Sequence, residues 1–427
     1  MKRNIFYSIL ITNLICYLLF YLPLKEPILL FTWNSILLSV LFIIIVIFIK
    51  KYDIIKNSLK YLILLGIIYR VILIPIQPIA SDDFYRYIWD GKVQANGINP
   101  YTYAPNDSTL KHLHSEQLPS KVNFQHLKTI YPPYSQWIFL FAYIIAGESF
   151  LGLKLLLLIT EILTIIFIFL TLKNLNKDQK YTLIYALSPL PIMQFFIDAH
   201  VDGFGITLFA AFFYLVSKNK WLYSYFVLGL SITSKLITIM IYPFLLRGRS
   251  IKNFMALIIV PSITVCLIYV PYSINGFPFE SLLIFVQNWY SNASVFTLFQ
   301  KIFNDNFLSR IFSMALFFVS FVWLYFSKKE LIEKSYLIFT LFFIFSPVVH
   351  PWYITWVAFL TAINFRWSGV VFISTISISN IYAMNYIINK KWEMNEWLLL
   401  FEYLPVIILL AIEEIRLKRK NLNLELS

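Results

Sequence analysis

The chain has 427 residues, of which 59% are hydrophobic and 13% are charged. Soluble domains contain about 45–50% apolar and about 25% charged residues, so this composition excludes an ordinary soluble protein and predicts an integral membrane protein. Lysine and arginine outnumber aspartate and glutamate by 35 to 22, which gives a net charge of +13. In a membrane protein such an excess anchors helices at the cytoplasmic side, so we expect no nucleic-acid partner.

Apolar runs recur along the whole chain, and a bilayer-spanning helix needs about 20 such residues, or somewhat fewer when it is short or tilted. They predict an all-α polytopic membrane protein forming a single domain over 1–427, with about 12–14 transmembrane helices because some short neighbours pair as broken helices. The apolar stretch 134–147 is too short to cross, so we expect a re-entrant or interfacial helix there. The other expected helices lie near 5–22, 30–49, 61–79, 151–172, 181–197, 203–217, 221–234, 236–246, 253–271, 309–326, 336–348, 352–365, 367–388 and 396–413.

Successive membrane helices cross in opposite directions. When the N-terminus is placed on the cytoplasmic side, the connections between helices therefore fall into two sets that differ in charge. The opposite, outer side then receives two long loops, 80–134 and 272–308, and the segment 389–396. We therefore expect a multi-pass protein of the cell (inner or plasma) membrane, with both termini cytoplasmic and its chemistry at the outer face. The basic clusters that alternation places inside, as the positive-inside rule requires, are 50–60, 173–180, 218–220, 247–252, 328–334, Arg366 and 416–420.

The first outer loop carries two adjacent carboxylates, Asp82 and Asp83, at the start of a predicted short interfacial helix over 83–95. One carboxylate can act as a general base toward a hydroxyl group, and such a pair can also hold a divalent cation. The alternative is a structural N-cap, in which a polar side chain bonds the free amides of the helix. Arg86 and Asp90 follow on the same helix, and the planar guanidinium of Arg86 suits phosphate oxygens.

A second polar group, Asp198, His200 and Asp202, lies at a predicted outer helix junction. These side chains converge only if the chain turns there, which Gly203 and Gly205 permit. They would then bind sugar hydroxyls or steer an acceptor. A metal site is a further possibility, although a fourth convergent ligand is missing. The structural alternative is a set of polar helix ends bonded to water.

Lys235 separates the apolar runs 221–234 and 236–246. A lysine at membrane depth costs about 2.5–3.5 kcal/mol, so it needs a partner or an interface. A lipid phosphate would provide a negative charge and hydrogen-bond acceptors. The alternative is a side chain that extends to the surface while its stem stays in the apolar layer.

These stretches together resemble the GT-C fold glycosyltransferases, in particular the polyprenyl-phosphate-sugar-dependent mannosyltransferases. Bacterial families and the GPI mannosyltransferase I catalytic subunit belong to this group. The resemblance covers residues from about 61 to 365, and the chain differs from the simplest layout in having two helices within 1–60 ahead of the loop-bearing one. The residues that carry it are SDDFYRYIWDGKVQANGINPYTYAP, IYPPYSQ, ALSPLPIMQFFIDAHVDGFGI, SKLITIMIYPFLLR, NWYSNASVF and FSPVVHPWY.

The resemblance implies transfer of a hexose, with mannose expected, from a polyprenyl-phosphate carrier to a lipid-linked or cell-surface glycan acceptor. It implies that an acidic residue at the start of the first outer loop is the catalytic base. By its position in the motif this role falls to Asp83 first and to Asp82 second. The family also implies a single displacement with inversion of configuration at the sugar. Membrane lipid is a further expected partner.

The resemblance also implies a donor pocket at the later outer junction that contains His350, Trp352 and Tyr353. His350 would pair with the donor phosphate, or it would be purely structural. Trp352 or Tyr353 would stack on a sugar or an isoprenyl unit. Lys235, Arg86 and His350 are then the expected cations that stabilise the leaving phosphate.

Two other functions are open to a chain with many spans. A transporter or flippase of lipid-linked glycans would carry charges near mid-bilayer and paired repeats, whereas here the charges gather toward one face and no repeat is evident. A polysaccharide ligase would transfer a preassembled glycan and would need an open groove.

Overall fold

The computed structural model describes residues 2–52, 58–246, 250–274, 276–390 and 395–425, and these form helices with no β-strand among them. The predicted all-α fold is therefore confirmed. The α-helices are α1 (Lys2–Leu18), α2 (Pro27–Lys51), α3 (Leu59–Leu73), α4 (Asp83–Ala95), α5 (Pro133–Ala146), α6 (Leu151–Asn174), α7 (Thr182–Ala186), α8 (Pro189–Phe196), α9 (Asp202–Ser217), α10 (Trp221–Ser234), α11 (Tyr242–Leu246), α12 (Ile251–Ser273), α13 (Glu280–Asn288), α14 (Val295–Phe303), α15 (Asn306–Phe326), α16 (Leu331–Phe345), α17 (Pro351–Ile363), α18 (Trp367–Thr375), α19 (Asn380–Asn389) and α20 (Glu396–Glu425). The 3-10 helices are η1 (Leu19–Tyr21), η3 (Ser108–Leu113), η4 (Gln179–Tyr181), η5 (Leu236–Ile241) and η6 (Ile376–Ser379).

Six helical segments of the described chain are long and apolar enough to cross a membrane. They are Lys2–Tyr21, Pro27–Lys51, Leu151–Asn174, Ile251–Ser273, Asn306–Phe326 and Trp367–Asn389. Shorter apolar helices accompany them at Pro133–Ala146, Asp202–Ser217, Leu236–Leu246 and Pro351–Ile363. The protein is thus a polytopic helical membrane protein. The predicted count of about 12–14 crossings is reached only if short and broken helices also cross the membrane.

Several predicted helices have different bounds in the structure: the helix predicted over 61–79 ends at Leu73, and the one predicted over 367–388 is divided into α18, η6 and α19. The run 181–197 is not one helix, because α7 ends at Ala186 and α8 begins at Pro189. Proline lacks the N–H that would continue the first helix, and its fixed φ suits the first turn of the next one. The last helix, predicted over 396–413, continues to Glu425.

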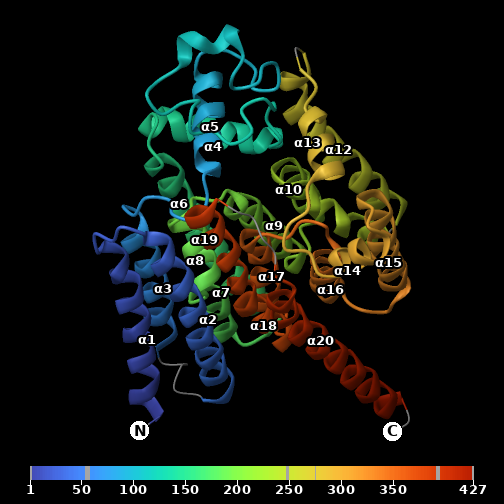
Figure 1. Cartoon of the computed structure of the whole chain (residues 1–427). Coiled ribbons are helices and arrows are strands. Elements are labelled where there is room, and N and C mark those ends of the chain that lie inside the picture. Colours follow the sequence, from blue (N-terminus) through green and yellow to red (C-terminus); the bar gives the residue numbers. More distant parts are fainter. Residues whose placement is uncertain (1, 53–57, 247–249, 275, 391–394, 426–427) are drawn as a thin grey trace.

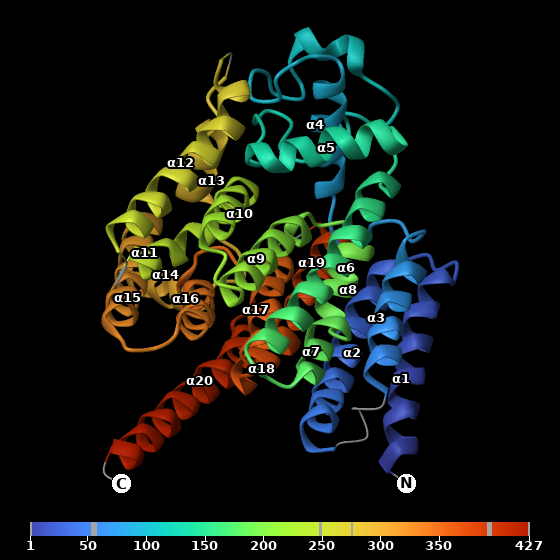
Figure 2. The same ribbon diagram turned by 180° about the vertical axis from the view of Figure 1, so that it is seen from behind.

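The helices α4 and α5 form a separate part of the molecule at the top of Figure 1, and both labelled termini lie at the bottom. Figure 2 shows the same arrangement from behind. The two helices cross closely, since a Cβ added at Gly91 would lie 2.3 Å from the backbone oxygen of Phe139. Only glycine permits this approach. The stretch predicted as a re-entrant or interfacial helix is therefore α5, which packs on α4.

Two lysines predicted on the cytoplasmic side contact the end of the predicted helix 352–365. The Lys50 Nζ lies 4.4 Å from the centre of the Phe365 ring, and the Lys177 Nζ donates to the Ile363 carbonyl at 3.1 Å. The compartment that each end of the molecule faces stays a prediction. Members of the predicted inner and outer sets that lie outside the described residues are Lys56, Arg247, Arg249, Asn275 and 391–394, and nothing is described for the side chain of Lys420.

Candidate functional site

The carboxylate pair lies where the chain enters α4. Asp82 occupies the N-cap position and Asp83 is the first helical residue, but the Asp82 side chain makes no cap hydrogen bond. Instead, the Asn123 amide donates to Oδ1 of Asp82 at 3.1 Å and to Oδ1 of Asp83 at 2.9 Å. The hydroxyl of Tyr87 donates to the other Asp83 oxygen at 3.5 Å, and the Asp83 side chain keeps 20% of its surface exposed. The Asp83 carboxylate is therefore held in place yet reachable.

The Asp83 carboxyl titrates above the ordinary aspartate range. Burial, and after it the negative charge of Asp82, raise the pKa of Asp83 to about 6, although the hydrogen bond from Asn123 acts in the opposite direction. At neutral pH the group is ionised, and it is a stronger base than a fully solvated aspartate. A general base works best when its pKa lies near the operating pH. Asp83 therefore has the protonation behaviour that this role requires.

Asp82→Asn should shift the acid limb of the pH profile to lower pH. If Asp83 is the base, kcat/KM falls as the pH drops through its pKa near 6. A neighbouring negative charge disfavours ionisation, so its removal lowers the pKa of Asp83 and preserves activity to lower pH. The measurement is kcat/KM against pH for the wild type, Asp82→Asn and the control Asp107→Asn. An acid limb at the same pH in all three would contradict the assignment.

Asp198 holds the chain that leads into the carboxylate pair. Its Oδ1 accepts hydrogen bonds from the backbone N–H groups of Ile79 and Ala80, both at 2.9 Å, and the residue is 1% exposed. The ammonium of Lys154 on α6 donates to the carbonyl of Ile76 on the same stretch. Burial raises the pKa of Asp198 to about 6. Asp198 thus contacts protein backbone, and the substrate contact predicted for it stays a prediction.

Arg86 and Asp90 pair with each other inside the part formed by α4 and α5. The Arg86 Nε lies 3.1 Å from Asp90 Oδ1, and both terminal nitrogens of Arg86 donate to the Leu127 carbonyl at 3.0 Å. The Gln136 amide donates to the second Asp90 oxygen at 3.1 Å. These bonds tie α4 to α5 and to the chain before it. A phosphate contact by Arg86, or a substrate contact by Asp90, stays a prediction from the sequence.

The structure brings the two distant histidine junctions to Asp83. The Nδ1 of His200 lies 3.8 Å from Asp83 Oδ2. The indole of Trp352 stacks on His200, with ring centres 3.7 Å apart, and on His350, with ring centres 4.4 Å apart. Tyr353 meets the His350 ring edge-on at 5.4 Å. Residues 150 positions apart along the chain, from two of the predicted outer junctions, therefore share one aromatic stack.

Both histidines are neutral at neutral pH. Burial, and after it the charge of Lys235, lower the pKa of His350 to about 3. Burial also lowers the pKa of His200 well below its usual value, with His350 and Lys235 acting in the same direction. Neither ring nitrogen of His200 has a hydrogen-bond partner within the described part of the chain. The imidazoles can exchange hydrogen bonds with a ligand, but at neutral pH they add no positive charge, which differs from the cationic role expected for His350.

Lys235 follows the end of α10 and forms an ion pair with Asp202, the first residue of α9. The same Asp202 oxygen accepts a hydrogen bond from the Trp356 indole at 2.8 Å. The Lys235 ammonium lies 3.8 Å from the centre of the Tyr353 ring. The Lys235 side chain is 29% exposed, whereas that of Asp202 is 5% exposed. The partner that a lysine at this depth requires is thus Asp202, and the ammonium stays accessible beside Tyr353.

A buried pair that the sequence did not reveal supports the loop that carries His350. Ser291 makes two backbone hydrogen bonds of 2.9 Å to that loop. The next residue, Asn292, is 2% exposed, and its amide donates to Glu402 on α20 at 2.7 Å. Glu402 is completely buried. An acidic residue inside the apolar run 396–413 was the available signal, since such a residue needs a partner.

Asn292→Ala should destabilise the protein by about 1–3 kcal/mol, because it leaves a buried oxygen of Glu402 without its donor. The matched control is Asn288→Ala, since the Asn288 side chain is exposed and its amide donates to the Ile284 carbonyl of the same helix. Thermal unfolding in detergent compares the two variants. We expect a lower melting temperature for Asn292→Ala alone, and equal melting temperatures would rule out a supporting role for the pair.

No group of three or more His, Cys, Asp or Glu side chains in the described ranges is placed to hold a metal ion. Asp82 and Asp83 remain the carboxylates that the sequence suggests for a divalent cation. In the structure both present an oxygen to the Asn123 amide. A cation requirement therefore stays a prediction.

No curated protein matches the chain. A family model described as alpha-(1->6)-mannopyranosyltransferase, N-terminal domain, matches residues 23–247, which is more than half of the chain. The matched region contains Asp83, His200 and Lys235, and it confirms the resemblance to mannosyltransferases. The chain therefore belongs to the alpha-(1->6)-mannopyranosyltransferase family and is a mannosyltransferase.

Proposed function

We propose that the protein transfers mannose from a polyprenyl-phosphate carrier to a lipid-linked or cell-surface glycan, at the outer face of the membrane, with Asp83 as the base. The observation that carries this proposal is the partly exposed Asp83 carboxylate, whose pKa is raised to about 6 beside His200. A lipid-linked donor suits a chain with many membrane-length helices and no Gly-rich strand–turn–helix fingerprint for a nucleotide.

The reaction is a single displacement. The acceptor hydroxyl oxygen forms a bond to C1 of mannose while the bond from C1 to the phosphate oxygen breaks. The phosphate leaves with the bonding electrons, and the acceptor proton passes to the Asp83 carboxylate. This path inverts the configuration at C1, so a β-linked donor gives an α-linked product. An α linkage is also the one named in the description of the family.

The leaving phosphate gains negative charge as the bond breaks, and a fixed cation lowers the energy of that state. Lys235 would supply this cation. Asp202 fixes its position, and Asp202 is itself oriented by the Trp356 indole. His350 in its neutral form would donate a hydrogen bond to the phosphate. The rings of Trp352 and Tyr353 would contact the sugar or the first isoprenyl unit.

The configuration of the product tests this mechanism. Purified protein is incubated with β-linked polyprenyl-phosphate mannose and a mannose-terminated oligosaccharide, and the new linkage is read by NMR. We expect an α-linked mannose. A β-linked product would show retention of configuration and would exclude the single displacement, while still leaving a mannosyltransferase.

A further inference from the structure

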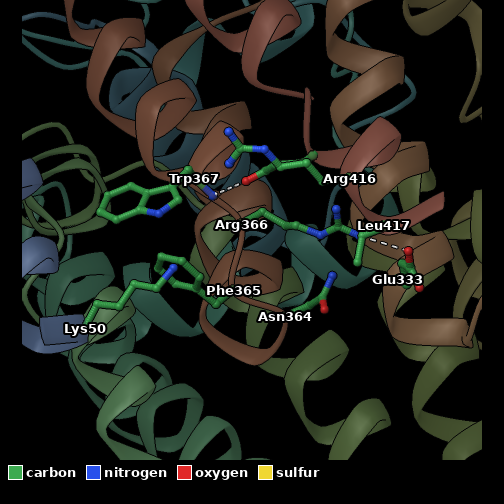
Figure 3. Close-up of a pocket in the computed structure, with 9 residues that line it drawn as sticks. Lys50, Glu333, Asn364, Phe365, Arg366, Trp367, Arg416 and Leu417 are labelled. Atoms are coloured by element: carbon green, nitrogen blue, oxygen red, sulfur yellow. Dashed lines mark hydrogen bonds and ion pairs between the residues drawn. The ribbon is translucent and has the colours of Figure 1, made fainter. Parts of the chain in front are cut away.

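A polar pocket lies away from Asp83, at the end of the molecule that carries the termini. Its volume is about 380 Å³. It forms where the end of α2, the connection between α17 and α18, and the helix α20 come together (Figure 3). The residues that line it are Lys50, Glu333, Asn364, Phe365, Arg366, Trp367, Glu413, Arg416 and Leu417.

The ends of two membrane-length helices meet at the pocket, as expected for a site at a membrane–water boundary. The apolar segment Pro27–Lys51 ends at it, and the apolar segment Trp367–Asn389 begins at it. Tryptophan is typical of such boundaries because its ring is apolar and its N–H is polar. The Lys50 ammonium lies 5.3 Å from the centre of the Trp367 ring, so a positive charge stands beside the aromatic wall.

The carboxylates around the pocket already have partners. Arg366 pairs with Glu333 at 2.9 Å and with Glu414 at 3.2 Å, and Lys329 pairs with the same two carboxylates. These two cations and two anions form a neutral network. Arg366 and Lys329 are therefore neutralised by these carboxylates and attract an anionic ligand only weakly.

The Glu413 carboxylate is engaged in hydrogen bonds at the start of α18. It accepts a hydrogen bond from the backbone N–H of Trp367 at 2.6 Å and one from the Ser368 hydroxyl at 2.5 Å. By contrast, Lys50 and Arg416 are exposed and have no carboxylate partner within the described ranges. With three basic and two acidic side chains in its lining, the pocket carries one net positive charge.

An unused hydrogen-bond donor also lines the pocket. The side-chain nitrogen of Asn364 is buried and has no hydrogen-bond partner among the described residues. A buried donor without an acceptor costs about 1–3 kcal/mol, which an acceptor oxygen from a ligand would offset. The complementary ligand therefore has one negative charge and several acceptor oxygens, as a phosphodiester does.

We propose that this pocket binds the phosphate of an anionic phospholipid headgroup. Lys50 and Arg416 would hold the phosphate oxygens, and Asn364 would donate to one of them. The position between the ends of two membrane helices favours a lipid over a soluble phosphate. Basic pockets between membrane helices are known to take such headgroups. The site is separate from Asp83 and does not depend on the donor of the transfer reaction.

Lipid retention tests the proposal. Native mass spectrometry measures how much phosphatidylglycerol and phosphatidylcholine the purified protein keeps in detergent. The test variant is Lys50→Ala/Arg416→Ala, and the matched control is Lys418→Ala, which removes a charge from the same helix outside the pocket. We expect the test variant to retain about fivefold less phosphatidylglycerol than the wild type and the control, since it loses two charge-assisted contacts.

Two further comparisons keep the result interpretable. Lys50→Arg/Arg416→Lys preserves both charges and should retain phosphatidylglycerol, and melting temperatures measured without lipid establish that every variant is folded. Equal retention of phosphatidylglycerol by wild type and the Ala variant would overturn the proposal. The melting temperature is also measured with added inorganic phosphate and with added phosphatidylglycerol. A rise with inorganic phosphate and no preference for phosphatidylglycerol would also overturn the proposal, because the site would then take a soluble anion.

Discussion

Asp83→Asn should lower kcat for mannosyl transfer by about 10²–10⁴, the range attributed to a general base. Asparagine has nearly the same shape, and its side-chain oxygen can still accept the hydrogen bond that Asn123 donates to Asp83 at 2.9 Å. The variant loses only the group that takes the acceptor proton. The measurement is the rate of label transfer from a radioactive lipid-linked donor, together with a melting temperature as a check on folding.

The control for this substitution is Asp107→Asn in the same loop. Asp107 accepts a hydrogen bond from the backbone N–H of Thr109 at the start of η3. Asparagine caps a helix about as well as aspartate, so this variant should keep wild-type activity. A folded Asp83→Asn variant with more than about a tenth of wild-type activity would contradict the assignment of the base. If Asp82→Asn were the inactive variant, the role would pass to Asp82.

Lys235→Met should lower kcat by about 10²–10³, because it removes the cation that we assign to the leaving phosphate. Methionine keeps much of the length of the side chain. The substitution also leaves Asp202, whose side chain is 5% exposed, without its ion-pair partner. Removing one member of a buried pair is strongly destabilising. A loss of activity in the single variant can therefore arise from misfolding as well as from lost catalysis.

The double variant Lys235→Met/Asp202→Asn separates these two causes. It removes the unpaired charge, so we expect the melting temperature to recover while kcat stays low. Lys235→Arg keeps the positive charge and should retain more activity than Lys235→Met. Recovery of both stability and kcat in the double variant would show that Lys235 only balances Asp202, and it would exclude a role at the phosphate.

Local signals in the sequence located the helix that presents the carboxylates. Asp82 precedes the first turn of α4, and the chain turns at Gly97, whose φ of +76° favours glycine. The predicted bounds 83–95 are those of α4. Within the apolar run 181–197, Pro189 marks the start of α8, because proline cannot continue the preceding helix.

The partners of the site residues could not be predicted in the same way. Lys235 stood out because a charge in an apolar run is costly. That its partner is Asp202, 33 positions away, depends on how α9 and α10 pack. Asn123 and Trp356 also contact the site. Asparagine and tryptophan occur at many positions along the chain, so nothing in the sequence distinguishes these two residues. Contacts between distant segments follow from packing, which a single sequence does not reveal.

The most direct test of the central claim is the identity of the donor. Purified protein in lipid vesicles is given radiolabelled polyprenyl-phosphate mannose or radiolabelled GDP-mannose, each with mannose-terminated acceptors. We predict that label enters the acceptor from the polyprenyl-phosphate donor and not from the nucleotide. Transfer from GDP-mannose in the absence of any polyprenyl-phosphate mannose would contradict the account.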